Sequence, residues 1–88
     1  MNLEVVAIYD VKAQAYMRPF FVPRVAMAVR SFTDEVNRNS PENQLFSHPE
    51  DFRLVHLASF SEDSGQFENL PHPVLLVEAV NLVKNGGV

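Results

Sequence analysis

The fold depends most on residues 23–38, which read PRVAMAVRSFTDEVNR. Apolar residues recur in this stretch every three or four positions, which is the spacing of one face of an α-helix. The proline at its start suits the first turn of a helix, because its φ is already near the helical value. The apolar stripe comprises Val25, Ala28, Val29, Phe32 and Val36. We therefore expect a helix from Arg24 to Arg38 that packs on the rest of the domain through this stripe.

Segments on either side of this helix have the alternating pattern of β-strands. Leu3–Tyr9 carries apolar residues on both faces, which predicts a central strand, and Phe52–Phe60 also alternates. The acidic turn Glu62–Gly65 then reverses the chain into a strand at Gln66–Glu68, with Gly65 where a positive φ is needed. The sequence thus predicts an α+β domain, in which one main helix packs on one face of an antiparallel sheet of three or four strands.

The C-terminal segment Pro73–Lys84 has two competing patterns. Its valines favour a strand, whereas its polar residues form a helical stripe that ends at Gly86–Gly87. We interpret it as a short strand at Val74–Val77, the fourth of the sheet, followed by a short helix.

Two further segments are expected to have less regular structure. Ala13–Pro23 ends in two prolines around PFFVP, which favours an extended, ordered loop. Two short helical turns are expected between residues 40 and 50, the second with Ser47 as its cap and Glu50 three residues on.

Length and composition indicate one small globular domain covering residues 1–88. A chain of 88 residues buries roughly 60–65% of the surface that it exposes when unfolded, which is enough for one core. The absence of cysteine excludes disulfides, thiol nucleophiles and cysteine zinc sites. No apolar run approaches the roughly 20 residues of a membrane span, and the first residues lack the basic region of a secretion signal. We expect a soluble protein without a membrane anchor.

Positive charge is concentrated in one part of an acidic chain. The protein carries a formal net charge of −4, yet residues 11–38 hold five basic residues against two acidic ones, a net +3. Single-stranded nucleic acids are usually held by arginines or lysines on phosphates and by aromatic faces on which bases stack. Residues 16–24, YMRPFFVPR, have this composition. The candidate nucleic-acid-binding residues are therefore Arg18, Phe20, Phe21, Arg24 and Arg30.

A structural explanation of the same residues competes with this hypothesis. Phe20 and Phe21 can equally be core or dimer-interface residues, since aromatic side chains in small domains are usually buried. The arginines of the helix can simply pair with Asp34 at neighbouring turns. Exposed phenylalanines beside Arg18 and Arg24 would favour DNA, and buried ones would favour a protein adaptor.

Catalytic and metal-binding patterns are weak in this sequence. His48, Glu50 and Asp51 lie close together, but Glu50 and Asp51 are also typical of a helix start, so we expect no metal site. His56 is expected to be a hydrogen-bonded, partly buried strand residue. There is no glycine-rich phosphate loop and no nucleophile elbow. We expect a binding protein that is not an enzyme and needs no cofactor.

Four short blocks of the chain carry a family resemblance. They are IYDVKA at 8–13, PFF at 19–21, AVRSFTDEVN at 28–37 and HPEDFRL at 48–54. In this order and spacing, from about residue 5 to about residue 67, the chain resembles the small non-structural protein of gokushoviruses, bacteriophages of the Microviridae with circular single-stranded DNA genomes. The resemblance implies a viral protein in the cytoplasm of the infected bacterium, absent from the virion and acting in DNA replication. It carries over no catalytic residues.

Two functions follow as expectations. The first is weak binding of single-stranded DNA during genome replication or the switch to single-strand synthesis, with Arg53 outside the site. The second is an adaptor that binds a phage or host replication or assembly protein without touching DNA. Open sheet edges and exposed aromatics also favour a homodimer or higher oligomer.

Overall fold

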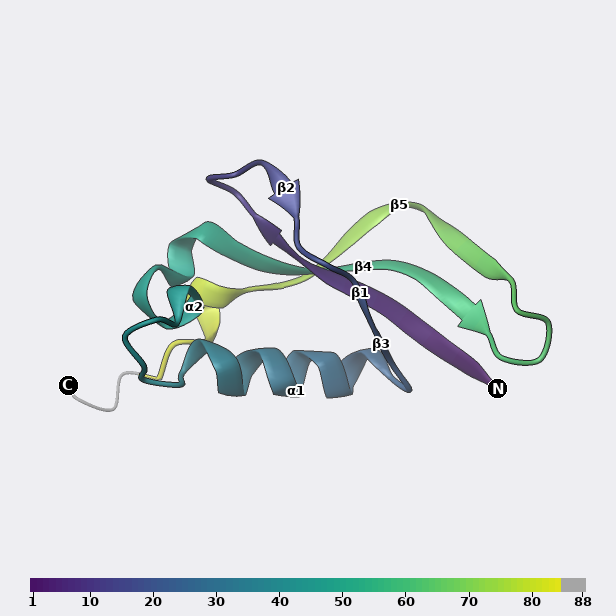
Figure 1. The fold of residues 1–88 in the computed structure, drawn as a ribbon, viewed down its shortest axis with the longest axis horizontal. Helices are drawn as coiled ribbons and strands as arrows, with labels where there is room; N and C mark the ends of the chain where they lie inside the picture. Colours follow the sequence, from purple (N-terminus) through teal and green to yellow (C-terminus); the bar gives the residue numbers. More distant parts are fainter. Residues whose placement is uncertain (85–88) are drawn as a thin grey trace.

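The computed structural model describes residues 1–84, and it has one long helix lying along one face of a twisted antiparallel sheet (Figure 1). The elements in chain order are β1 (Asn2–Asp10), β2 (Ala15–Tyr16), β3 (Phe20–Val22), α1 (Val25–Val36), α2 (Gln44–Ser47), a 3-10 turn η1 (Pro49–Asp51), β4 (Phe52–Ser61), β5 (Phe67–Glu78) and a second 3-10 turn η2 (Ala79–Leu82). The predicted α+β class and the helix packed on one face are confirmed.

β1 is the central strand that its two apolar faces predict. It pairs along its whole length with β4, from Asn2 opposite Ser61 to Asp10 opposite Phe52. On its other side it pairs with β2 and β3. The strand order is β2-β1-β4-β5, with β3 also beside β1. β1 therefore has neighbours on both sides at residues 4–6 and 9–10, where it is an inner strand of the sheet.

The sheet has five strands, which corrects the prediction of three or four. Ala13–Pro23 was expected to be a loop, yet it contains β2 and β3, which both lie antiparallel to β1. The turn before β2 is closed by Asp10, whose carboxylate accepts a hydrogen bond from the Ala13 N–H, and Gln14 adopts a positive φ of 55°. A loop prediction failed here because both strands are very short, and each is a strand only through its pairing with β1.

The predicted second hairpin is present, but its outer strand is longer than expected. Gly65 has a φ of 72° in the turn, as its position required. The segments predicted as separate strands, Gln66–Glu68 and Val74–Val77, fall on the single strand β5, apart from Gln66, which directly precedes it. β5 lies at the sheet edge, where Pro71 and Pro73 remove no hydrogen bond from an inner ladder.

α1 packs on the sheet through the predicted stripe. Ala28, Phe32 and Val36 are buried against Val6 and Leu54 of the sheet. The helix ends at Val36, two residues before the predicted Arg38. Val25 and Val29 are only partly buried, because they lie at the border of the packed face.

Asn37 explains why α1 stops early and how the C-terminal segment is held. Its side-chain amide donates to the carbonyl oxygens of Thr33 at 2.8 Å and Leu82 at 3.0 Å, and its side-chain oxygen accepts from the Lys84 N–H at 2.7 Å. The predicted order of strand then short helix in this segment is confirmed by β5 and η2. The predicted helix end at Gly86–Gly87 lies outside the described residues.

Asn43 is a buried polar residue that the sequence did not single out. Its amide donates to the carbonyl oxygens of Glu35 at 2.8 Å and Arg38 at 2.9 Å, and its side-chain oxygen accepts from the Leu45 N–H. Asn43 thereby caps α2 and joins it to the end of α1. The predicted cap, Ser47, is instead the last residue of α2, and its hydroxyl donates to the Asn43 carbonyl.

Replacing Asn43 by alanine should lower the free energy of unfolding by about 2–3 kcal/mol, because it leaves buried carbonyl and N–H groups without partners. Chemical denaturation of Asn43→Ala measures the loss. Asn39→Ala, an exposed neighbour, is the control and should change stability by less than about 0.5 kcal/mol. Equal stability of the two variants would contradict the capping role.

Candidate nucleic-acid interface

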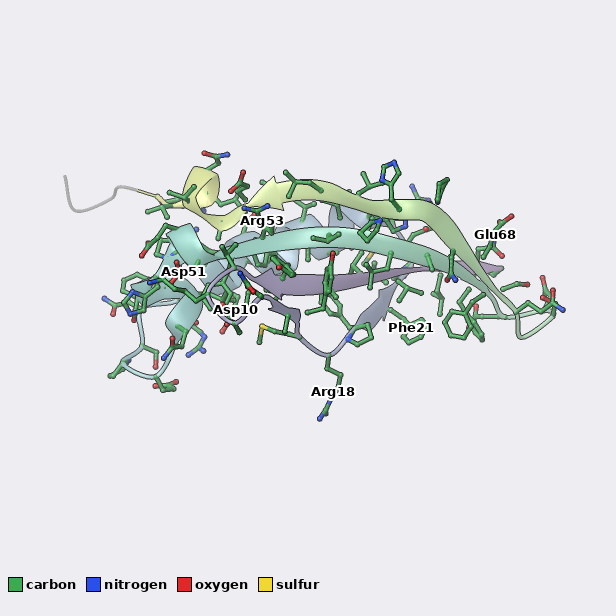
Figure 2. All side chains as sticks on the ribbon, turned by 90° about the horizontal axis from the view of Figure 1, so that it is seen from above. Asp10, Arg18, Phe21, Asp51, Arg53 and Glu68 are labelled. Atoms are coloured by element: carbon green, nitrogen blue, oxygen red, sulfur yellow. The ribbon has the colours of Figure 1, made fainter. Side chains whose placement is uncertain are left out.

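The two faces of the sheet have different environments. Successive strand residues point to opposite faces, and directly opposed residues on neighbouring strands share a face. The face with Val6 and Leu54 packs on α1. The opposite face, here called the open face, is toward the viewer in Figure 2. Its residues, assigned by strand register, include Leu3, Val5, Ala7, Tyr9, Tyr16, Phe21, Arg53, Val55, Ala58, Phe60, Phe67 and Leu75.

Three phenylalanines from three strands form a cluster on the open face. The ring centroids of Phe21 and Phe60 are 5.7 Å apart, those of Phe60 and Phe67 are 4.9 Å apart, and those of Phe21 and Phe67 are 6.1 Å apart. These distances are typical of aromatic pairs in contact. Phe21 is 47% exposed and Phe67 is 57% exposed. The phenylalanine cluster therefore presents aromatic surface to the solvent.

A second group of side chains crosses the same face further along β1. Tyr9 lies opposite Tyr16 of β2 on one side and opposite Arg53 of β4 on the other. The two tyrosine rings are 4.8 Å apart. Between this tyrosine–arginine row (Tyr16, Tyr9 and Arg53) and the phenylalanine cluster, the sheet carries small buried residues, among them Ala7 and Val55.

Arg53 is incompletely paired in this row. Its Nη2 lies 3.7 Å from a carboxylate oxygen of Glu78, too far for a hydrogen bond. Its Nε is buried and has no acceptor among the described residues. A buried donor without an acceptor costs about 1–3 kcal/mol. The Arg53 side chain as a whole is 38% exposed, so its outer N–H groups remain open to an acceptor. The expectation that Arg53 lies outside the site rested on its sequence position, and the register instead places it on the open face.

The five predicted binding residues do not share one surface. Phe20 and Phe21 are adjacent in β3 and so point to opposite faces, with Phe20 packed against the core beside α1. Arg30 is exposed on α1, roughly half a helical turn from the buried Phe32, and so points away from the sheet. Arg24 is the exposed residue that precedes α1.

Arg18 is the predicted arginine nearest in sequence to the exposed phenylalanine. It lies in the link between β2 and β3, and its side chain extends outward from that edge of the sheet (Figure 2). Phe21, three residues further along the chain, lies on the open face. Of the predicted residues, Phe21 lies on the open face and Arg18 extends from the edge beside it (Figure 2), while Arg24 lies two residues past the end of β3.

His56 lies on the helix side of the sheet and has a structural role. Its Nε2 is 2.9 Å from a carboxylate oxygen of Glu4, and the Ser59 hydroxyl donates to the same oxygen at 3.0 Å. The histidine ring is 17% exposed and Glu4 is 24% exposed. This agrees with the prediction of a partly buried, hydrogen-bonded histidine. The serine and histidine both contact the carboxylate rather than each other, so this is not the arrangement of a nucleophile and its base.

One histidine and two acidic residues after α2 form the weak metal-site pattern that was considered from the sequence. Potential ligand atoms of His48, Glu50 and Asp51 lie within 4.8 Å of one another. His48 Nδ1 is 3.7 Å from Glu50, and both side chains are more than half exposed. Exposed groups of this kind are common without a metal, and no second feature points to one.

Charged groups at the end of α1 shift one another's titration. The hydrogen bonds that Arg38 donates hold the pKa of Glu35 below its ordinary value, and the bond from the Ser40 hydroxyl lowers the pKa of Glu42. Arg38 pairs with Glu35 at 2.7 Å and with Glu42 at 3.4 Å, rather than with Asp34 as the spacing suggested. These pairs are solvent-exposed and belong to the helix end rather than to the open face.

Comparison with known proteins identifies a phage protein. The chain matches the family described as Phage ORF5 protein over residues 3–82, and it belongs to that family. No match was found among curated proteins or among solved structures. Within residues 1–84, no helix is long and apolar enough to cross a membrane, and no pocket is formed.

Proposed function

We propose that this phage protein binds single-stranded DNA on the open face of its sheet. The observation that carries the proposal is the phenylalanine cluster, in which Phe21 and Phe67 hold about half of their surface in solvent. Bases stack on exposed aromatic rings with about 1–3 kcal/mol each. Arg18 and Arg24, on either side of β3, supply positive charge for the phosphates.

The proposed ligand is a single strand for two reasons. Bases in a duplex are already stacked on their neighbours, so their faces are not free to meet Phe21 or Phe67. The net charge of −4 also disfavours general binding to a polyanion, because duplex affinity depends strongly on neutralising many phosphates. Binding should therefore be weak, salt-sensitive and tolerant of sequence.

We place this activity in a gokushovirus-like phage of the Microviridae. The short blocks that resemble the non-structural protein of those viruses support that setting, and their genomes are single-stranded DNA. The protein then acts in the cytoplasm of the infected bacterium, outside the virion, during genome replication or the switch to single-strand synthesis.

An adaptor role is the second candidate, and the same cluster favours it. Exposed aromatic residues are enriched at protein interfaces, and the acidic chain suits a basic partner. That partner would be a phage or host replication or assembly protein, or a second copy of this chain in a homodimer or higher oligomer. Under this alternative the open face binds protein and DNA is not contacted.

Fluorescence polarisation with a labelled thirty-nucleotide single strand and a matched duplex tests the first proposal. We expect saturable binding of the single strand at low salt and weaker binding of the duplex. If Arg18 and Arg24 neutralise two phosphates, log K should fall with log salt with a slope of about −1.4 or steeper. Arg18→Ala and Arg24→Ala should each flatten the slope by about 0.7, because each removes one phosphate contact.

Arg30→Ala is the matched control, since this arginine points away from the sheet and should leave the slope unchanged. Light scattering in the same buffer gives the oligomeric state for each variant. Absence of single-strand binding at low salt, with a stable dimer or larger assembly in solution, would contradict the DNA proposal and favour the adaptor.

A further inference from the structure

The tyrosine–arginine row lies on the same face as the phenylalanine cluster but apart from it. Phe21 is opposite Val5 of β1, whereas Tyr16 is opposite Tyr9, four residues further along the same strand. At about 3.3 Å per residue, this separation is roughly 13 Å. A base stacked on one group cannot touch the other, so they are two distinct contact points along β1.

The row combines the two chemistries that a nucleotide needs. Tyr16 is 47% exposed and rests on Tyr9, which gives a base an aromatic surface supported from behind. Arg53 follows Tyr9 directly across the sheet, and its guanidinium is held near Glu78 without a hydrogen bond to it. The Arg53 side chain is 38% exposed, so the outer N–H groups of its guanidinium can donate to a phosphate or base oxygen.

We propose that Tyr16, Tyr9 and Arg53 form a second nucleotide-binding point, so that one single strand runs along β1 and contacts both groups. This rests on the proposed function, which it extends. A base stacks on Tyr16 and Arg53 donates to the adjoining phosphate, while the intervening nucleotides cross the side chains that cover the buried Ala7 and Val55. The ligand must then be long enough to bridge roughly 13 Å, which excludes a single nucleotide.

The intrinsic fluorescence of the tyrosines reports on the second nucleotide-binding point without an added label. The chain has two tyrosines, both in the row, and no tryptophan. Titration with unlabelled oligothymidylate should quench the emission, and the affinity should rise as the oligonucleotide lengthens from two to six nucleotides. Tyr16→Phe should keep the affinity and reduce the quenched signal. Tyr16→Ala should weaken binding by roughly 5- to 150-fold, the range for losing one stacked base.

The role of Arg53 is tested by the salt dependence of binding and by a substitution of its neighbour Glu78. Arg53→Gln should flatten the slope of log K against log salt by about 0.7, as expected for one lost phosphate contact. Glu78→Gln should tighten binding, because it removes the carboxylate beside the guanidinium. Circular dichroism and a thermal melt establish that each variant is folded before the affinities are compared.

The outcomes separate this inference from the proposed function. Binding seen by polarisation, with unchanged tyrosine emission and no effect of Tyr16→Ala or Arg53→Gln, would overturn the second contact point and leave the phenylalanine site in place. No binding by polarisation at all would overturn the proposed function itself. A tyrosine signal that changes on dilution without DNA would assign the row to a contact between two copies of the chain, which also overturns the inference.

Discussion

Replacing Phe32 by alanine should lower the free energy of unfolding by about 3–5 kcal/mol, the usual cost of emptying a buried phenylalanine site. Phe32 is 3% exposed and lies at the centre of the α1 stripe, between Ala28 and Val36. A domain of 88 residues has a total stability of only about 5–15 kcal/mol, so the variant should be largely unfolded at moderate temperature. Thermal and urea denaturation followed by circular dichroism measure the loss.

Met27→Ala is the matched control for this prediction. Met27 lies in the same helix but is 50% exposed, so truncation leaves no cavity. It should change stability by no more than about 0.5 kcal/mol. A Phe32→Ala protein that melts with the parent would mean that α1 does not anchor the core.

The patterns that extend over many residues of this sequence predicted the fold well. The three- and four-residue spacing in residues 23–38 predicted the face of α1 that is buried, and the double apolar face of Leu3–Tyr9 predicted the central position of β1. Both signals extend over many residues, so local propensity and burial agree. The end of α1 was misplaced by two residues, because it depends on Asn37 bonding to Leu82, far along the chain.

The short strands β2 and β3 could not be recognised from their own residues. Prolines at 19 and 23 indicate an interrupted, extended segment, and this is compatible with a loop or with edge strands. What makes them strands is their pairing with the edge of β1, across a tight turn for β2 and across a longer stretch of chain for β3. Asp10 did carry a local signal, since an aspartate at the end of a strand often closes a turn.

The candidate interface was predicted in part for the same reason. Composition drew attention to Arg18 and Phe21, but it treated Phe20 as equivalent to Phe21. Alternation would have separated the two had the segment been predicted as a strand. The partners Phe60 and Phe67 come from a hairpin about forty residues or more away, and only the pairing of β1 with β3 and β4, and of β4 with β5, brings them to Phe21. Arg53 joins the face through the same register.

Replacing Phe21 and Phe67 together by leucine should weaken single-stranded DNA binding by about 2–4 kcal/mol, on the order of 30- to 1,000-fold in Kd. Leucine keeps apolar volume beside Phe60 but removes the aromatic faces on which bases stack. The salt slope should stay the same, because stacking releases no counterions. Polarisation titrations across a salt series measure both quantities.

Phe20→Leu is the control that makes this result specific. Phe20 is the neighbour of Phe21 in β3, yet it points to the helix side and packs against the core. The same phenylalanine-to-leucine change there should leave the affinity unchanged, apart from a modest loss of stability that a thermal melt records. If Phe20→Leu weakened DNA binding as much as the double variant, or if the double variant bound like the parent, the open face would not be the surface on which the strand stacks.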